Sequence, residues 1–405
     1  MRRPYTRMIL LVVLAAWAVA LTAAPPAPAA ARQAWTVMVY LDGDNNLDQW
    51  GWYNLDQMAR GLTSARDVTI VVLYDHAGNT GAEKWLVVPG GRRLLASVSE
   101  PDMGSPATLA SFASWAMKAF PADKYVLDLW DHGRGWAYFA SDDTNASRMM
   151  IADLARAMAQ AEKAAGDKID LTVFDGCSMA MIELSYQLRA LTDVLGASQQ
   201  VVPLEGLPYE PIVRSLVARP GQCAADLGRV IVDSYVSFYL DELNASTTTV
   251  TFSAIDETRV ASLGASYDRL AGALLSGVDG WKAQIAAAAA AVSEHQVYGW
   301  GLNGSLRFVD SYRFAWEIAR RIDDPEVDRA AADLMMGLLG GLYERHSPQQ
   351  DGHSNGLSVS FPSSQPQYDF VNWLRYDYAG IGLDFPADTR WDELLLRYYQ
   401  GNSGK

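Results

Sequence analysis

Cysteine is scarce in this chain: among 405 residues, only Cys177 and Cys223 carry a thiol. Exported domains that rely on disulfides for their stability contain many more cysteines, so a disulfide-bonded scaffold is excluded. Two interpretations stay open at this point. Either the two cysteines form a single bridge, or one of them is a free functional thiol.

Positive charge is also in short supply. The chain has 33 Lys and Arg residues against 47 Asp and Glu residues, and its formal net charge is −14. A protein with this balance repels nucleic acid and anionic membranes, so we expect no nucleic-acid partner. Half of the residues are hydrophobic and 11% are aromatic, which excludes global disorder and allows a sizeable core.

Long hydrophobic runs are absent after the first segment of the chain. Residues 1–31 begin with Arg2, Arg3 and Arg7, continue with the apolar run 8–20 and end in a stretch rich in alanine and proline. This order is typical of a bacterial secretory signal peptide, and the apolar run is shorter than the roughly 20 residues that span a bilayer. We therefore expect an exported monomer, periplasmic or secreted, without stable membrane insertion after signal removal. An uncleaved membrane anchor is the alternative.

Short apolar runs alternate with helical patterns along the first half of the chain. Strands separated by helices in this way predict an α/β fold with a mainly parallel sheet that is covered on both faces. Residues 84–88 and 93–98, on either side of a Pro-Gly-Gly turn, predict a hairpin, and residues 248–253 and 356–361 predict further strands among C-terminal helices. The predicted core strands are residues 35–41, 68–74, 125–130, 169–174 and 194–197.

Two residues that can perform nucleophilic chemistry follow consecutive core strands. His132 comes directly after one strand, and Cys177 comes after the next, where the chain is expected to turn into a helix. A right-handed crossover places such strands side by side, so the thiol and the imidazole would form a nucleophile–base pair. Unpaired amides at a helix start would favour the thiolate and could stabilise an oxyanion.

Each of these residues also has a simpler interpretation. Free cysteine behaves as a small hydrophobic residue, so Cys177 alone could be part of the core. A lone histidine such as His132 is more often structural than catalytic. His76 also ends a predicted strand and is the rival base, although it lacks the Gly-Arg-Gly sequence that follows His132.

The surrounding motifs resemble a known family. Trp130-Asp-His-Gly133, followed by Asp175-Gly-Cys-Ser-Met179, is similar to the catalytic motifs of clostripain-like peptidases, which belong to the caspase–gingipain–legumain superfamily. The resemblance runs from about Trp35 to Pro362. It implies a three-layer α/β/α caspase-like sandwich and hydrolysis of peptide bonds after Arg or Lys. We take residues 32–362 as the peptidase domain and residues 363–405 as a C-terminal extension that packs on it.

The resemblance also implies roles for individual residues. Cys177 attacks the scissile carbonyl, and His132 acts as the base and then protonates the leaving amine. The backbone N–H groups of Gly133 and Cys177 bind the oxyanion. The partners it implies are peptides or proteins with a basic P1 residue, the residue whose carbonyl is attacked.

Three further side chains are candidates for binding that P1 residue. Asp175 matches the family's acid beside the nucleophile, and a buried carboxylate pairs well with a guanidinium. Its alternative role is a cap on the following helix. Glu205 is a second acidic candidate, or an exposed loop acid without a role. Trp136 either forms a wall of the pocket or packs in the core.

Arg148 is the candidate site for self-cleavage. The resemblance to the family suggests maturation at a basic residue in this region, and Arg148 lies in segment 141–150, which we expect to be a polar, flexible loop. An ordinary loop arginine is the alternative.

No cofactor is required by this reading, and the sequence contains no recognisable metal motif. Asp42, Asp44 and Asn46 alternate like the start of a calcium-binding loop, but Leu47 replaces the required glycine and Tyr53 replaces the required glutamate. Because enzymes of the resembled family often respond to calcium, the resemblance leaves a calcium dependence open.

Two other functions stay open. The first is a cysteine hydrolase or transpeptidase of the same fold with a different P1 preference. The second is a binding protein that keeps the fold without catalysis. A disulfide between Cys177 and Cys223 would also silence the enzyme.

Overall fold

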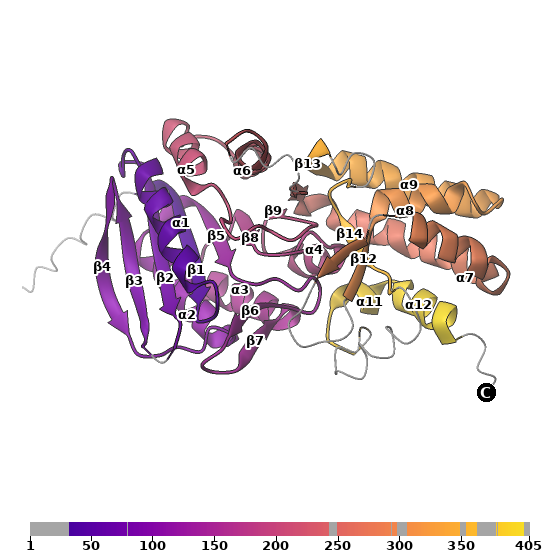
Figure 1. Ribbon diagram of the computed structural model, residues 1–405, viewed down its shortest axis with the longest axis horizontal. Helices are drawn as coiled ribbons and strands as arrows, with labels where there is room; N and C mark the ends of the chain where they lie inside the picture. Colours follow the sequence, from indigo (N-terminus) through magenta and orange to yellow (C-terminus); the bar gives the residue numbers. More distant parts are fainter. Residues whose placement is uncertain are drawn as a thin grey trace, which may run out of the picture. The chain divides into compact units, whose positions relative to one another are not determined.

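The computed structural model describes most of the chain after the first 31 residues (Figure 1). The predicted signal peptide and residues 363–377 of the predicted C-terminal extension lie outside this part. The described residues are 32–78, 80–242, 249–292, 294–297, 306–348, 354–362, 378 and 380–400. Within them, no helix is long and apolar enough to cross a membrane.

A nine-stranded sheet organises the described residues, in the order β13-β10-β9-β8-β5-β1-β2-β3-β4. Its centre is parallel, from β9 to β2, and antiparallel strands flank it on both sides. The predicted core strands and the predicted hairpin, which forms β3 and β4, are confirmed. The strands are β1 (Gln33–Gly43), β2 (Val68–His76), β3 (Ala82–Val88), β4 (Gly91–Val98), β5 (Ala122–Trp130), β8 (Leu171–Asp175), β9 (Val194–Ala197), β10 (Thr251–Asp256) and β13 (Leu342–His346).

Helices cover both faces of this sheet, because alternate residues of each strand point to opposite sides. Met38 and Tyr40 of β1 belong to one hydrophobic cluster, and Val39 and Leu41 belong to another. The first cluster includes α2 (Pro106–Ala119), α3 (Ile151–Ala165), α4 (Ile182–Leu188) and α7 (Val260–Ala291); the second includes α1 (Asp48–Gly61), α5 (Tyr209–Ala218) and α6 (Ala224–Ser237). The predicted three-layer α/β/α sandwich is therefore confirmed.

The C-terminal part adds helices and a small sheet. Residues 356–361 were expected to form a strand, and they do so as β14, which joins a separate three-stranded sheet instead of the main one. Trp391 is fully buried, and its Nε1 donates a hydrogen bond to the carbonyl of Ser360 at 3.0 Å. The elements are β11 (Glu294–Val297), β12 (Leu306–Asp310), β14 (Ser358–Ser360), α8 (Ser311–Ala319), α9 (Pro325–Gly341), α11 (Asp384–Asp388) and α12 (Trp391–Gln400).

Segment 138–150 departs from the sequence prediction. Instead of a flexible loop, it forms a hairpin of β6 (Tyr138–Asp142) and β7 (Ser147–Met150), with Arg148 on the second strand. The hairpin is anchored because Phe139 and Met149 are buried in the core. Only the tip of the segment is polar and exposed. The expectation of a flexible loop followed from the polar composition of this tip.

Candidate active site

A cleft of about 670 Å³ opens at the carboxyl ends of the parallel strands. Its lining includes Cys177, His132, Gly133 and Asp175, four of the residues that the sequence predicted for the site. Strands β5 and β8 are direct parallel neighbours, and Trp130 lies opposite Asp175. The expected side-by-side placement of the two motif strands is therefore confirmed.

Two glycines allow the loops after β5 and β8 to pack against each other. A Cβ atom on Gly133 would lie 2.3 Å from the carbonyl oxygen of Cys177. A Cβ atom on Gly176 would lie 2.8 Å from the carbonyl oxygen of Asp131. Real Cβ atoms do not approach backbone this closely, so any side chain at either position would push the nucleophile loop and the histidine loop apart.

The thiol of Cys177 is in a poorly solvated position, and its Sγ donates to the carbonyl oxygen of Val202 at 3.9 Å. Burial and, to a smaller extent, the charges of Asp175 and Asp131 raise the pKa of Cys177 to about 11, while backbone hydrogen bonds at Val202 and Gly133 oppose this shift. The expected helix start is absent here, because α4 begins only at Ile182. The amide of Ser178 instead donates to the carbonyl of Gln200 at 2.9 Å. The prediction that a helix start favours the thiolate was therefore wrong, and the raised pKa favours the protonated thiol.

The imidazole of His132 is held by a residue that sequence reasoning did not assign to the site. Its Nε2 lies 2.9 Å from Oδ1 of Asn46. An amide oxygen only accepts hydrogen bonds, so Nε2 carries the proton and Nδ1 is left free to act as a base. Burial lowers the pKa of His132, and the charge of Asp143 partly opposes this. The lowered pKa favours the neutral form of the ring.

The loop that carries Asn46 is itself fixed by hydrogen bonds. Asn45 donates from Nδ2 to Oδ1 of Asp131 at 2.8 Å, and its Oδ1 accepts from the amide of Leu47 at 2.8 Å. Because Asp131 is adjacent to His132 in the chain, these bonds join the loop after β1 to the loop after β5. The hydrogen bond between Asn45 and Asp131 joins residues far apart in sequence, so the sequence alone does not indicate it. In the sequence, the loop after β1 stands out only because it is rich in Asp and Asn.

Asp175 lines the cleft and is buried. Its Oδ2 accepts from the amide of Leu207 at 2.9 Å and from the hydroxyl of Tyr209 at 3.0 Å. Burial raises the pKa of Asp175 to about 6, and these two hydrogen bonds oppose the shift. Gly206 adopts φ +67°, and a Cβ atom there would lie 2.6 Å from Oδ2 of Asp175. The carboxylate is therefore preorganised and ionised above about pH 6.

The sequence of the chain identifies its relatives. The sequence model of the clostripain family matches residues 39–319, which is more than half of the chain and includes both His132 and Cys177. The chain belongs to the clostripain family. The resemblance inferred from the two motifs is confirmed.

Individual members of the clostripain family support this placement. Clostripain of Hathewaya histolytica is 25% identical over 225 residues, which cover 46% of this chain and 43% of clostripain, so less than half of that relative is matched. A secreted C11 cysteine protease from Bacteroides thetaiotaomicron, solved with an irreversible peptide inhibitor, superposes with a TM-score of 0.63 at 19% identity, covering 85% of this chain and all of the other. An inactive zymogen C11 protease from Parabacteroides distasonis superposes with a TM-score of 0.66 at 19% identity, covering 89% and 99% of the two chains. These neighbours confirm the caspase-like fold.

Several residues considered from the sequence do not line the cleft of this clostripain-family chain. Trp136 is buried and donates from Nε1 to Oγ of Ser360 at 3.1 Å, so of its two proposed roles the structure shows packing. Glu205 is half-exposed and is not among the lining residues. His76, the rival base, lies between Asp48 and Glu83, 3.3 Å from each, and is also outside the lining.

The remaining candidates are placed as follows. Arg148 is exposed on β7 and contributes to the cleft lining, with its guanidinium over the ring of Tyr138. Cys177 and Cys223 are both free, so no bridge joins them.

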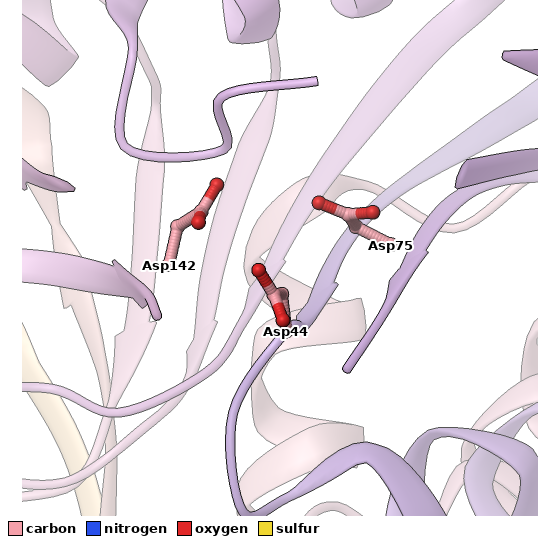
Figure 2. A group of neighbouring side chains, drawn as sticks. All are labelled: Asp44, Asp75 and Asp142. Carbon is pink, nitrogen blue, oxygen red and sulfur yellow. The ribbon is translucent and has the colours of Figure 1, made fainter. Parts of the chain in front are cut away.

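A group of acids close to the cleft could hold a metal ion. It consists of Asp44, Asp75 and Asp142 (Figure 2). The sequence search noticed only Asp44, because the three residues come from separate elements.

Proposed function

We propose that this protein is an exported cysteine endopeptidase that hydrolyses peptide bonds after Arg or Lys. The observation that carries the proposal is the cleft, in which a thiol, an imidazole and a buried carboxylate line the same volume. Membership of the clostripain family supports the nucleophilic chemistry. The layout of residues 1–31 supports export.

Catalysis begins with two neutral groups. As Sγ of Cys177 attacks the scissile carbonyl, Nδ1 of His132 takes the thiol proton and Nε2 stays bonded to Asn46. The electron pair of the carbonyl bond moves to its oxygen, and the backbone N–H groups of Gly133 and Cys177 stabilise that oxyanion. General-base assistance of this kind accelerates such a step by roughly 10²- to 10⁴-fold.

The tetrahedral intermediate then collapses and the bond to the leaving amine breaks. His132 donates its acquired proton to the amine nitrogen, and a thioester remains on Cys177. A water molecule that transfers its proton to His132 attacks the thioester. The second collapse releases the carboxylic acid product and returns the proton to the sulfur, which restores the resting thiol.

Asp175 gives the proposed selectivity for basic side chains. Its carboxylate is buried, is fixed by Leu207 and Tyr209, and lines the same cleft as the nucleophile, which follows it by two residues. An Arg or Lys side chain in the cleft would provide the missing positive charge, which is favourable where water is excluded. Because the pKa of Asp175 is about 6, cleavage after basic residues should weaken as the pH falls through that value.

We also propose that cleavage after Arg148 matures the enzyme. Arg148 is exposed on β7 and lines the cleft of the uncut chain, so cutting there would release a cleft residue. One structural neighbour has been solved as an inactive zymogen. An Arg148→Ala protein should stay a single chain, as should Cys177→Ala. A two-chain active form whose second chain does not begin at Met149 would refute this step.

Matched fluorogenic peptides that end in Arg, Lys, Asn or Asp test the main proposal. The wild-type protein should cleave after Arg and Lys, and the Cys177→Ala protein should cleave none of them. Cleavage after only Asn or Asp would still support Cys177 as the nucleophile, but it would refute the role of Asp175 in selecting basic side chains. Silence on every peptide, even after limited proteolysis near Arg148, would favour a non-catalytic binding protein.

A further inference from the structure

Arg134 places a buried positive charge in the cleft. It comes two residues after His132, lines the cleft and is only 5% exposed. Its guanidinium has no hydrogen-bond or ion-pair partner among the described residues. A buried guanidinium costs free energy unless an acceptor or a negative charge compensates it. The charge of Arg134 therefore requires a partner that the described part of the chain does not supply.

The acids that line the same cleft do not provide this partner. Asp131 and Asp175 each accept hydrogen bonds from neighbouring groups of the chain. The third acid, Asp143, is exposed in the turn between β6 and β7. Within the described residues, none of the three forms an ion pair with Arg134. The acids of the cleft and its buried cation are therefore not matched to each other.

The backbone around Arg134 is held in one conformation. Its amide donates to the carbonyl of Tyr138 at 3.0 Å, and its carbonyl accepts from the amide of Ala137 at 3.2 Å. Gly135 adopts φ +58°, and a Cβ atom there would lie 2.4 Å from the ring of Phe308. Because the backbone is fixed and the side chain is buried, little conformational freedom is lost when the guanidinium binds a ligand.

A carboxylate is the partner that fits this guanidinium best. Two N–H groups of a guanidinium donate in parallel to the two oxygens of a carboxylate, which gives a strong and directional contact. The net charge of −14 disfavours polyanions such as nucleic acid, so the partner is a single negative group. None of the side-chain nitrogens of Arg134 is fully enclosed without a partner, so a group that enters the cleft can reach the guanidinium.

We propose that Arg134 binds a carboxylate of the substrate close to the cleaved bond. Arg134 is adjacent to Gly133, whose N–H group is proposed to bind the oxyanion, so the carboxylate belongs to a residue near the scissile bond. This inference rests on the proposed function. With a basic P1 residue at Asp175, the cleft selects peptides that carry a positive and a negative group close together. The negative group is an Asp or Glu side chain or the C-terminal carboxylate.

Peptide binding to the Cys177→Ala protein tests the proposal without hydrolysis. Fluorescent peptides share one Arg and compare Glu with Gln at each position next to it, and a second set compares a free C-terminus with an amidated one. Affinities are measured by fluorescence anisotropy on the uncut protein and on protein cut near Arg148 by limited proteolysis. We expect the carboxylate of one of these two sources to tighten binding by about tenfold, which corresponds to about 1.4 kcal/mol.

Substitutions of Arg134, made in the same Cys177→Ala protein, identify the group that is responsible. Arg134→Gln removes the positive charge and should abolish the preference, so that acidic and neutral peptides bind equally. Arg134→Lys keeps the charge without the planar fork and should keep only part of the preference. Arg93→Gln is the matched control, because it removes the same charge from an exposed position on β4 outside the cleft lining. It should keep the full preference.

Thermal unfolding separates a binding role from a structural one. Without peptide, Arg134→Gln should unfold at the same temperature as its parent or higher, because the substitution leaves no described group without a partner. The acidic peptide should raise the Tm of the parent protein and leave that of Arg134→Gln unchanged. Should Arg134→Gln fail to fold, Arg134→Lys and the preference of the parent protein provide the test.

The proposal is overturned if no peptide binds either form, or if acidic and neutral peptides bind the parent protein equally. It is also overturned if Arg134→Gln keeps the preference or if Arg93→Gln loses it. A wild-type protein that cleaves no peptide, while the Cys177→Ala protein prefers the acidic ones, would retain this site and refute the proposed function. Cleavage after Arg without any such preference would do the reverse, so the two can fail separately.

Discussion

Two neighbouring groups of buried side chains differ in how their charge is satisfied. In the cleft, Asp175 accepts hydrogen bonds from Leu207 and Tyr209, and His132 is bonded to Asn46. In the acidic group, Asp75 is equally buried and has no hydrogen-bond partner among the described residues. The buried charge of Asp175 in the cleft is therefore satisfied by protein atoms, whereas the described surroundings of Asp75 provide no such partner. Changes in the cleft should alter catalysis, and changes in the acidic group should alter stability.

The strongest test of this comparison removes the nucleophile. Cys177→Ala should lower kcat/KM for peptides ending in Arg by at least about 10³-fold, because Cys177 is the only thiol among the described residues that line the cleft. The measurement is steady-state hydrolysis, with the thermal unfolding temperature as the second readout, which should not change. Cys223→Ala, at an exposed free thiol, is the control and should keep full activity. If Cys177→Ala kept activity near the wild-type level, Cys177 would not be the nucleophile and the cleft would not be the catalytic site.

The protonation state of the thiol gives the next largest effect. Because burial raises the pKa of Cys177 to about 11, alkylation by iodoacetamide should accelerate by about tenfold per pH unit between pH 7 and 10. The rate is followed by mass spectrometry of the protein carrying Cys223→Ala. A rate that is already constant from pH 5 to 8 would instead indicate a preformed thiolate–imidazolium pair.

Replacing the acid in the cleft should cost less and should depend on the substrate. Asp175→Asn should lower kcat/KM for Arg peptides by about 30-fold, which corresponds to about 2 kcal/mol, because the charge partner of the substrate is lost. Peptides ending in the neutral analogue citrulline should change much less. Glu205→Gln is the matched control, since Glu205 does not line the cleft, and it should stay within about twofold of the wild type. An equal loss for both variants would contradict the role of Asp175.

The smallest effect should come from the residue that orients the base. Asn46→Ala should lower kcat by about tenfold, while KM stays nearly constant, because His132 loses the partner that fixes its protonated nitrogen. Asn46→Asp keeps an acceptor and adds a charge that raises the pKa of His132, so it should restore part of kcat and shift the acid limb of the pH–rate profile upward. The wild-type limb that reports His132 should lie below pH 6.5, since burial lowers that pKa. If the Asn46 variants lost thermal stability without any change in the pH–rate profile, Asn46 would have only a structural role.

The strands and the order of the motifs were predictable because they depend on local composition. Buried parallel strands are continuous apolar runs, and the crossover rule then brings the loops of His132 and Cys177 together. The hydrogen bond from His132 to Asn46 was not predictable, because it depends on side-chain directions in two loops that are distant in sequence. For the same reason, the placement of Asp75 and Asp142 beside Asp44 could not be predicted.

Local patterns also misled the sequence analysis where tertiary contacts dominate. Segment 141–150 is polar at its tip, but Phe139 and Met149 anchor it in the core and turn it into a hairpin. The start of a helix was expected directly after Cys177, yet the amides of Ser178 and Ala180 pair with the segment around Gln200 and delay the helix to Ile182. In both places, contacts with distant residues decide the backbone conformation.

The cleft draws its lining from positions as far apart as Asn45 and Gly206, spread over five loops of one folded sheet. No shorter piece of the chain contains the nucleophile, its base and the acid in their final places. A chain whose loops have not yet been brought together by the sheet therefore lacks the assembled cleft. The proposed cleavage activity consequently arises only once the sheet has folded.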